Sequence, residues 1–63
     1  MPIAQITIME GRDDAKKERL ITEVTEAIHR ALGAPRENIR VIIYEVKKTE
    51  FGIGGQSARQ LGR

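Results

Sequence analysis

Cysteine and tryptophan are absent from this 63-residue chain, and histidine occurs once, as His29. Disulfides are therefore excluded, and a structural metal site lacks the cluster of ligands that it needs. A chain of this length buries only about 60% of the surface that its unfolded form exposes, so its own core gives little stability. Small domains normally compensate with disulfides, metals or association. We therefore predict a single domain over residues 1–63 that binds no metal and associates with further copies of itself.

Long apolar runs and basic blocks are also missing. No stretch approaches 18 apolar residues and no charged segment precedes a long apolar one, which argues against a membrane span and a signal peptide. The 11 basic and 9 acidic residues are mixed along the chain, and the aromatic residues are only Tyr44 and Phe51. Nucleic-acid binders normally show a basic stripe, and single-strand binders add aromatic platforms. We expect a cytoplasmic protein that binds neither membrane nor nucleic acid, and whose surplus arginines bind a small dianion.

Two segments have the composition of strands. From Pro2 to Met9 the residues are mostly β-branched or small, and a second segment of this kind runs from about Ile39 to Val46. Between them, apolar residues recur at spacings of three and four, which predicts one long amphipathic helix: Leu20, Ile21, Val24, Ala27, Ile28, Ala31 and Leu32. Asp13 is placed to cap the N-terminus of this helix, and Gly33 is placed to end it.

The order strand, helix, strand predicts two parallel strands joined by a right-handed crossover. The following Phe51-Gly52-Ile53-Gly54-Gly55 indicates a tight turn or hairpin, and the tail Gln56–Arg63 has little pattern. The predicted fold class is thus α+β, a single β-α-β unit with a short C-terminal Gly-rich hairpin. One helix covers one face of the sheet, and two strands leave two open edges. Because both strands are apolar on both faces, we expect a homo-oligomer in which a second subunit extends the sheet and further copies cover the open face.

The helix also carries charged residues at regular spacing. Arg19 with Glu23, and Glu26 with Arg30, are four residues apart, and we predict that each pair forms an ion pair. His29 has no other His, Cys or carboxylate at ligand spacing. We expect it on the surface and assign it no role.

Pro2 is the first candidate catalytic residue. If Met1 is removed, Pro2 becomes an N-terminal secondary amine, and such amines have a reference pKa of about 7.7–8.0, closer to neutrality than lysine. Burial or nearby cations can then leave the nitrogen neutral and basic. The alternative is that proline is merely tolerated after Met1.

Three more residues are candidates for a site. Arg12 follows the first strand in a Gly-containing loop, Arg40 lies near the start of the second strand, and Phe51 lies in the Gly-rich turn. Each also has a purely structural interpretation. The Arg12 guanidinium could simply be solvated, Arg40 could pair with an acidic residue, and Phe51 could anchor the C-terminal turn. Extended chain at about 3.3 Å per residue separates Pro2 from Arg12 by roughly 30 Å. Antiparallel pairing of two subunits would bring these ends together, so a site that uses both residues lies at a subunit interface.

Taken together, these segments resemble the 4-oxalocrotonate tautomerase (2-hydroxymuconate tautomerase) family of the tautomerase superfamily. The resemblance rests on Pro2-Ile3-Ala4-Gln5-Ile6, Glu10-Gly11-Arg12, Ile39-Arg40-Val41-Ile42-Ile43 and Phe51-Gly52-Ile53-Gly54-Gly55, and it needs no gap from Pro2 to Gly55. It implies a tautomerase-like domain over residues 1–63 and a homohexamer built as a trimer of dimers. It also implies a cofactor-free isomerase that converts 2-hydroxymuconate to 2-oxo-3-hexenedioate in aromatic hydrocarbon catabolism.

The resemblance further implies a role for each candidate. Pro2 would be the general base. Arg40, from a neighbouring chain, would bind the 1-carboxylate and the 2-oxygen of the substrate, and Arg12, from another neighbour, would hold the distal carboxylate. Phe51 would form an apolar wall that excludes water and helps to keep Pro2 neutral.

Departures from the family pattern leave two alternatives open. The chain differs at Thr7, Met9, Asn38, Tyr44 and much of the tail after Gly55. Met9 and Asn38 could border the pocket, so these differences bear on substrate preference more than on reaction class. As one alternative, the same site could mainly hydrate or dehalogenate an unsaturated acid, or tautomerise a monocarboxylate. If Met1 is retained, the Pro2 nitrogen is an amide without a basic lone pair, and the protein would then be a non-catalytic oligomeric scaffold.

Overall fold

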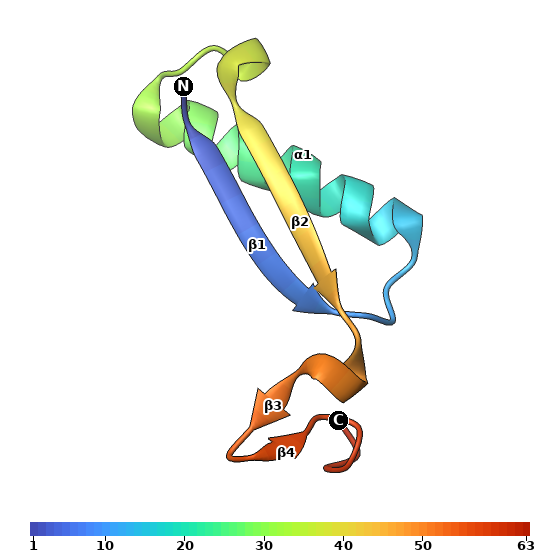
Figure 1. Cartoon of the computed structure of the whole chain (residues 1–63). Coiled ribbons are helices and arrows are strands. Elements are labelled where there is room, and N and C mark those ends of the chain that lie inside the picture. The colour runs from blue at the N-terminus through green and yellow to red at the C-terminus, as the bar shows by residue number, and fades with distance from the viewer.

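The computed structural model describes all 63 residues. Its elements are strand β1 (Ile3–Met9), helix α1 (Asp14–Leu32), strand β2 (Arg40–Val46), and the short strands β3 (Gly52–Ile53) and β4 (Gln56–Ser57). Two 3₁₀ turns, η1 (Arg36–Asn38) and η2 (Lys48–Glu50), precede β2 and β3. β1 and β2 pair in parallel, and β3 and β4 pair antiparallel (Figure 1). The predicted β-α-β unit with a C-terminal hairpin is confirmed.

Helix α1 begins and ends at the residues that the sequence indicates. The Asp13 carboxylate accepts a hydrogen bond from the Lys16 backbone N–H at 2.9 Å, which satisfies one of the free donors of the first turn. Gly33 adopts φ 68°, a left-handed conformation that glycine adopts without steric cost, and its N–H donates to the His29 carbonyl. The helix is not apolar over a length that could cross a membrane, and the chain has no other long helix.

Side chains alternate between the two faces of the sheet. α1 lies across one face (Figure 1), and the strand residues on that face are half-buried: Ala4, Ile6, Ile8, Val41 and Ile43. The opposite face is open, and it exposes 58% of Ile3, 38% of Ile42 and 49% of Tyr44. One face of an apolar sheet is therefore left uncovered by the chain itself.

The whole chain is too extended for a monomer of its size. Its radius of gyration is 14.6 Å, whereas a compact domain of this length is expected to have about 10.6 Å. Its accessible surface is 4819 Å², against about 4,100 Å² for a folded monomer of this mass. Only Ile39 and Ala58 are buried. The single chain thus buries almost no core, as expected from its length.

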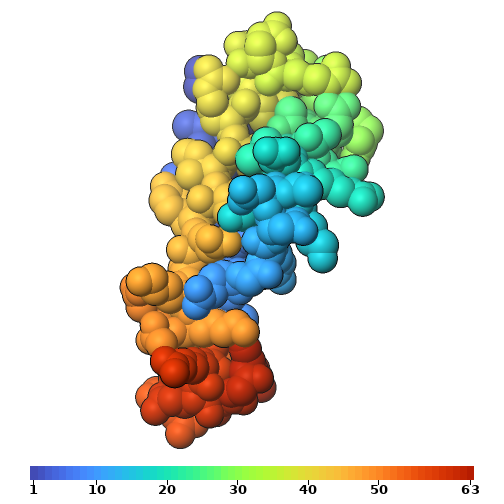
Figure 2. Space-filling view, turned by 90° about the vertical axis from the view of Figure 1, so that its right-hand side faces the viewer, coloured from blue at the N-terminus to red at the C-terminus, as the bar shows by residue number.

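Residues 47–63 form a separate C-terminal lobe. The lobe protrudes beyond the carboxyl ends of β1 and β2 (Figures 1 and 2). The Ala58 N–H donates to the Phe51 carbonyl at 2.7 Å, and Ser57 and Gln60 exchange two hydrogen bonds between side chain and backbone. The tail for which the sequence shows little pattern is thus ordered by hydrogen bonds within the lobe.

The predicted ion pairs along α1 are wrong. Neither Arg19–Glu23 nor Glu26–Arg30 forms; Glu26 instead accepts two hydrogen bonds from Arg36, at 2.6 Å from Nε and 2.9 Å from Nη2. This bidentate geometry matches the guanidinium fork better than a helical i,i+4 pair does. The bonds from Arg36 lower the pKa of the Glu26 carboxyl below its ordinary value.

His29 is half-buried, and the expectation that it lies on the surface is wrong. Its Nδ1 donates to the Ala34 carbonyl at 2.8 Å, just beyond the end of α1. The Nδ1–H group thus gives the Ala34 carbonyl a hydrogen-bond partner just after the helix, where carbonyl groups lack helical partners. Its role in the single chain is structural.

Candidate active site

Pro2 and Arg40 lie side by side at one end of the sheet. The Arg40 backbone N–H donates to the Pro2 carbonyl at 3.0 Å, which extends the parallel ladder by one residue beyond β1. Pro2 is half-buried here and Met1 is exposed. The structure thus brings together two of the four predicted site residues within one chain.

The Arg40 side chain is exposed and forms no ion pair. Its Nη1 donates to the Glu37 carbonyl at 2.7 Å, a neutral acceptor that leaves the guanidinium charge uncompensated. In the alternation along β2, Arg40 belongs to the same open face as Ile42. A chain that covers this face would meet Arg40.

Arg12 and Phe51 lie at the other end of the sheet. Arg12 follows β1, and Phe51 follows β2 in the C-terminal lobe, where it is half-buried. At about 3.3 Å per residue, β1 alone separates Pro2 from Arg12 by more than 20 Å. The structure therefore places Pro2 with Arg40 and, at the opposite end, Arg12 with Phe51.

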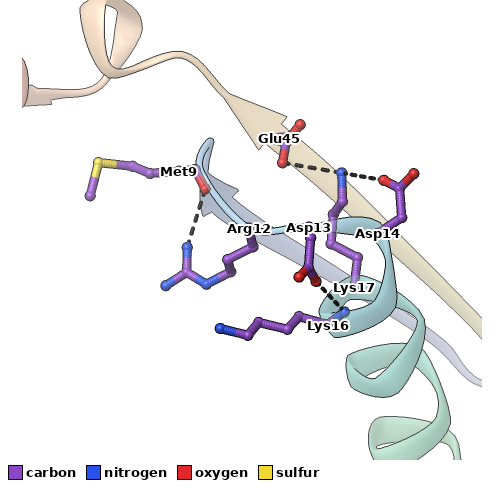
Figure 3. Close-up of polar contacts among 7 residues, drawn as sticks. All are labelled: Met9, Arg12, Asp13, Asp14, Lys16, Lys17 and Glu45. Atoms are coloured by element: carbon purple, nitrogen blue, oxygen red, sulfur yellow. Dashed lines mark hydrogen bonds and ion pairs between the residues drawn. The ribbon is translucent and has the colours of Figure 1, made fainter.

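Arg12 is also held by a neutral backbone acceptor. Its Nη1 donates to the Met9 carbonyl at 3.2 Å (Figure 3). Both Arg12 and Arg40 use Nη1 for these bonds, so the N–H groups on Nε and Nη2 remain free. The guanidinium edge formed by Nε and Nη2 can bind a carboxylate in bidentate fashion.

The carboxylates around Arg12 are engaged elsewhere. Lys17 lies 3.4 Å from both Asp14 and Glu45, between the start of α1 and the end of β2 (Figure 3). The hydrogen bond to Glu45 and then that to Asp14 raise the pKa of Lys17 above its ordinary value. These acids pair with Lys17, and Arg12 forms no ion pair.

A further contact at this end lies outside the sequence predictions. The Glu10 carboxylate accepts a hydrogen bond from the Lys48 backbone N–H at 2.9 Å, across 38 positions of sequence. A contact between residues so far apart in sequence cannot be predicted from residue spacing. It joins the end of β1 to the lobe that carries Phe51.

The single chain does not form a complete binding site. No pocket lies on its surface, and no group of three or more His, Cys, Asp or Glu residues is placed to hold a metal ion. The two halves of the candidate site lie at opposite ends of one sheet. If two chains pair antiparallel along a sheet edge, the Arg12 half of one chain lies beside the Pro2 half of the other. The resulting site would combine a proline, guanidinium groups and an apolar ring.

Comparison with known proteins identifies the family to which the chain is similar. The family model described as tautomerase enzyme matches residues 2–60. A 2-hydroxymuconate tautomerase from Stutzerimonas stutzeri is 62% identical over 63 residues, which is the full length of both chains. A 4-oxalocrotonate tautomerase isozyme from Methylibium petroleiphilum has a similar structure, with a TM-score of 0.93, 52% identity and coverage of 98% of this chain and 100% of its own. A heterohexamer 4-oxalocrotonate tautomerase from Chloroflexus aurantiacus gives a TM-score of 0.90 at 34% identity, with 97% and 98% coverage.

Proposed function

The chain belongs to the tautomerase family, and on this basis we propose that it is a cofactor-free isomerase of 2-hydroxymuconate. The reaction moves one proton from the 2-hydroxyl oxygen to carbon 5 and gives the conjugated 2-oxo-3-hexenedioate. The observation that carries the proposal is the pair of guanidinium groups, Arg12 and Arg40, each bound to a backbone carbonyl and neither paired with a carboxylate. Two such cations suit a substrate with a carboxylate at each end.

Pro2 is the proposed general base. As an N-terminal secondary amine it would remove the 2-hydroxyl proton and then deliver a proton to carbon 5. The neighbouring cations would depress the pKa of its conjugate acid toward the working pH, and exclusion of water would act in the same direction. This role requires that Met1 is removed.

The two arginines have different proposed roles. Arg40 would bind the 1-carboxylate and the 2-oxygen, where negative charge develops in the dienolate, so its effect would be largest in the transition state. Arg12 would hold the distal carboxylate and draw electron density toward that end. Phe51 would cover the site and exclude water.

A homohexamer built as a trimer of dimers would supply these groups from different chains. Edge-to-edge pairing would bring Arg12 of one chain to Pro2 of the next. A further chain that packs on the open sheet face would bring its own Arg40 to the Pro2 of the first chain, since Arg40 lies on that face together with Ile42. The hexameric relative supports an assembly of this size. We place the reaction in the meta-cleavage route of aromatic hydrocarbon catabolism.

An intact mass and a 2-hydroxymuconate assay on the same sample test the proposal. The mass should correspond to a chain without Met1, and ketonisation followed in the ultraviolet should be fast. A Met1-free protein that fails to accelerate ketonisation would overturn the proposal. A chain that retains Met1 and is inactive would favour the oligomeric scaffold.

A further inference from the structure

The C-terminal lobe, residues 47–63, has several hydrogen bonds within itself but only one to the rest of the chain. Within the lobe, the Arg59 N–H donates to the Lys48 carbonyl at 3.2 Å and the Arg63 N–H donates to the Ala58 carbonyl at 2.8 Å. Ala58 is completely buried. These internal bonds hold the lobe together, and Phe51 belongs to it through the bond from the Ala58 N–H to its carbonyl.

A single hydrogen bond ties this lobe to the β-α-β unit. It is the bond from the Lys48 backbone N–H to Glu10 Oε2, at 2.9 Å, and no ion pair adds to it. The covalent connection from Val46 to Lys47 is the other link. Within the single chain, the Glu10 contact is thus the one polar link that bears on the orientation of the lobe.

Glu10 is itself firmly placed. Its backbone N–H donates to the Val46 carbonyl at 2.9 Å and so continues the ladder between β1 and β2 past Met9. Its side chain then reaches the first N–H of η2, a donor that has no partner within the turn. Because the acceptor is a carboxylate, the bond is stronger than one between neutral groups.

The same residue stands next to the loop that carries Arg12. Glu10 precedes Gly11 and Arg12 in sequence, and Phe51 follows Lys48 by one short turn. Glu10 therefore joins the loop that carries Arg12 to the lobe that carries Phe51.

We propose that Glu10 is a positioning residue of the active site, which sets Phe51 against Arg12 by accepting the Lys48 backbone N–H. The part of this inference that concerns activity rests on the proposed function. Glu10 itself need not touch the substrate. Its loss would let the lobe turn about the Val46–Lys47 connection, and a displacement of about 1 Å in such a site can reduce the rate by about 10²-fold.

Two variants separate the hydrogen bond from the charge. Glu10→Ala removes the acceptor, whereas Glu10→Gln keeps an acceptor oxygen and removes the negative charge. Glu50→Ala is the matched control, because Glu50 is an exposed carboxylate of the same lobe whose side chain forms no hydrogen bond or ion pair. All three are made in the full-length, assembled protein.

Hydrogen exchange of the Lys48 amide reports the contact without reference to activity. In Glu10→Ala we expect exchange about tenfold faster or more, with rates close to wild type in Glu10→Gln and Glu50→Ala. Unchanged exchange in Glu10→Ala would overturn the proposal. This readout remains valid even if the wild-type protein does not act on 2-hydroxymuconate, so it distinguishes failure of the inference from failure of the proposed function.

Kinetics on 2-hydroxymuconate report the consequence for the site. Glu10→Ala should reduce kcat/KM about 10-fold to 100-fold with an unchanged oligomeric state, and Glu10→Gln should restore it to within a few-fold. In a Phe51→Ala background, Glu10→Ala should cause little further loss, because both changes act through the same ring. A full additional loss in the double variant, or no rescue by glutamine, would rule out positioning through Phe51.

Discussion

Arg40 donates its backbone N–H to the carbonyl of Pro2 at 3.0 Å, so the proposed base is fixed through its carbonyl and its nitrogen is left free of the ladder. This allows the chemistry of the nitrogen to be changed without loss of the hydrogen bond. Pro2→Ala keeps the carbonyl and replaces the secondary amine with a primary one. We expect kcat/KM for 2-hydroxymuconate to fall, but by less than the about 10²–10⁴-fold that a general base usually contributes, because the primary amine is still a base.

The other proline provides the control. Pro35 precedes η1 and has no proposed part in the site, so Pro35→Ala should leave kcat/KM near wild type. Intact masses of both variants must show removal of Met1. An undiminished rate in Met1-free Pro2→Ala would show that the reaction does not need the secondary amine of proline.

A site shared between chains can be tested by mixing inactive subunits. Because β1 separates Pro2 from Arg12, we predict that Pro2→Ala and Arg12→Ala chains, unfolded and refolded together, regain activity. In a random one-to-one mixture about a quarter of the sites would combine an intact Pro2 with an intact Arg12 from another chain. The assay is the rate of the mixture against that of each variant refolded alone.

The same design applied to Arg40 decides between two arrangements. Pro2→Ala mixed with Arg40→Ala should also regain activity, because Arg40 lies on the open face and is proposed to serve a neighbouring chain. No recovery would assign Arg40 to the Pro2 of its own chain. No recovery with Arg12→Ala would contradict the proposed interface itself.

Arg12 should matter most for substrates with two carboxylates. Arg12→Ala should raise KM for 2-hydroxymuconate and reduce kcat/KM about 10-fold to 100-fold, the loss expected when a charged hydrogen bond is removed. The loss should be much smaller for a 2-hydroxydienoate that lacks the distal carboxylate. Arg19→Ala, an exposed arginine of α1 without an ion pair, is the control. Equal losses on both substrates would contradict the role of Arg12 at the distal carboxylate.

Local patterns in the sequence were sufficient to predict the β-α-β unit and both helix ends. Asp13 and Gly33 act on backbone groups a few residues away, and the alternation along the strands follows from the two-residue period. Such features are encoded by neighbouring residues. The separation of Pro2 from Arg12 was predictable for the same reason, since it needs only the length of one strand.

Contacts between distant segments were not predictable in this way. Arg36 displaces Arg30 as the partner of Glu26 because the turn after α1 brings its guanidinium back over the helix. The bond from Lys48 to Glu10 joins residues 38 positions apart, and its donor is a backbone N–H that any residue except proline would supply. Spacing rules for side chains contain no information on either contact.

The pairing of Glu26 with Arg36 predicts a pH dependence of stability. Hydrogen bonds from Arg36 lower the pKa of Glu26 from its ordinary value of 4.5 in the folded chain. A carboxyl with a depressed folded pKa stabilises the fold above its unfolded pKa, and this stabilisation is lost as the pH falls through the folded pKa. Glu26→Gln should therefore lower the thermal midpoint at pH 7, and the difference from wild type should shrink below about pH 4.5.

Circular dichroism melts at constant ionic strength measure this difference. Glu23→Gln is the control, because Glu23 forms no ion pair and its removal should leave the midpoint near wild type. The effect of Glu26→Gln should be modest, since exposed ion pairs contribute little to stability. A difference that is the same at pH 7 and pH 3 would contradict the assignment.

The open face of the sheet predicts how the assembly can be broken. Ile42 is 38% exposed at the centre of that face and lies opposite Gln5 in the ladder. A charge buried at a subunit interface without a partner is strongly destabilising, so Ile42→Asp should dissociate the oligomer into smaller species and abolish most of the activity. Ala15→Asp places the same charge on the exposed first turn of α1, where a negative charge is favourable, and should leave both the assembly and the rate unchanged. Sedimentation velocity and the ketonisation assay on the same samples provide the comparison. An Ile42→Asp protein that sediments as wild type would show that other copies do not cover this face. Arg40 could then not reach the active site of a neighbouring chain through this face.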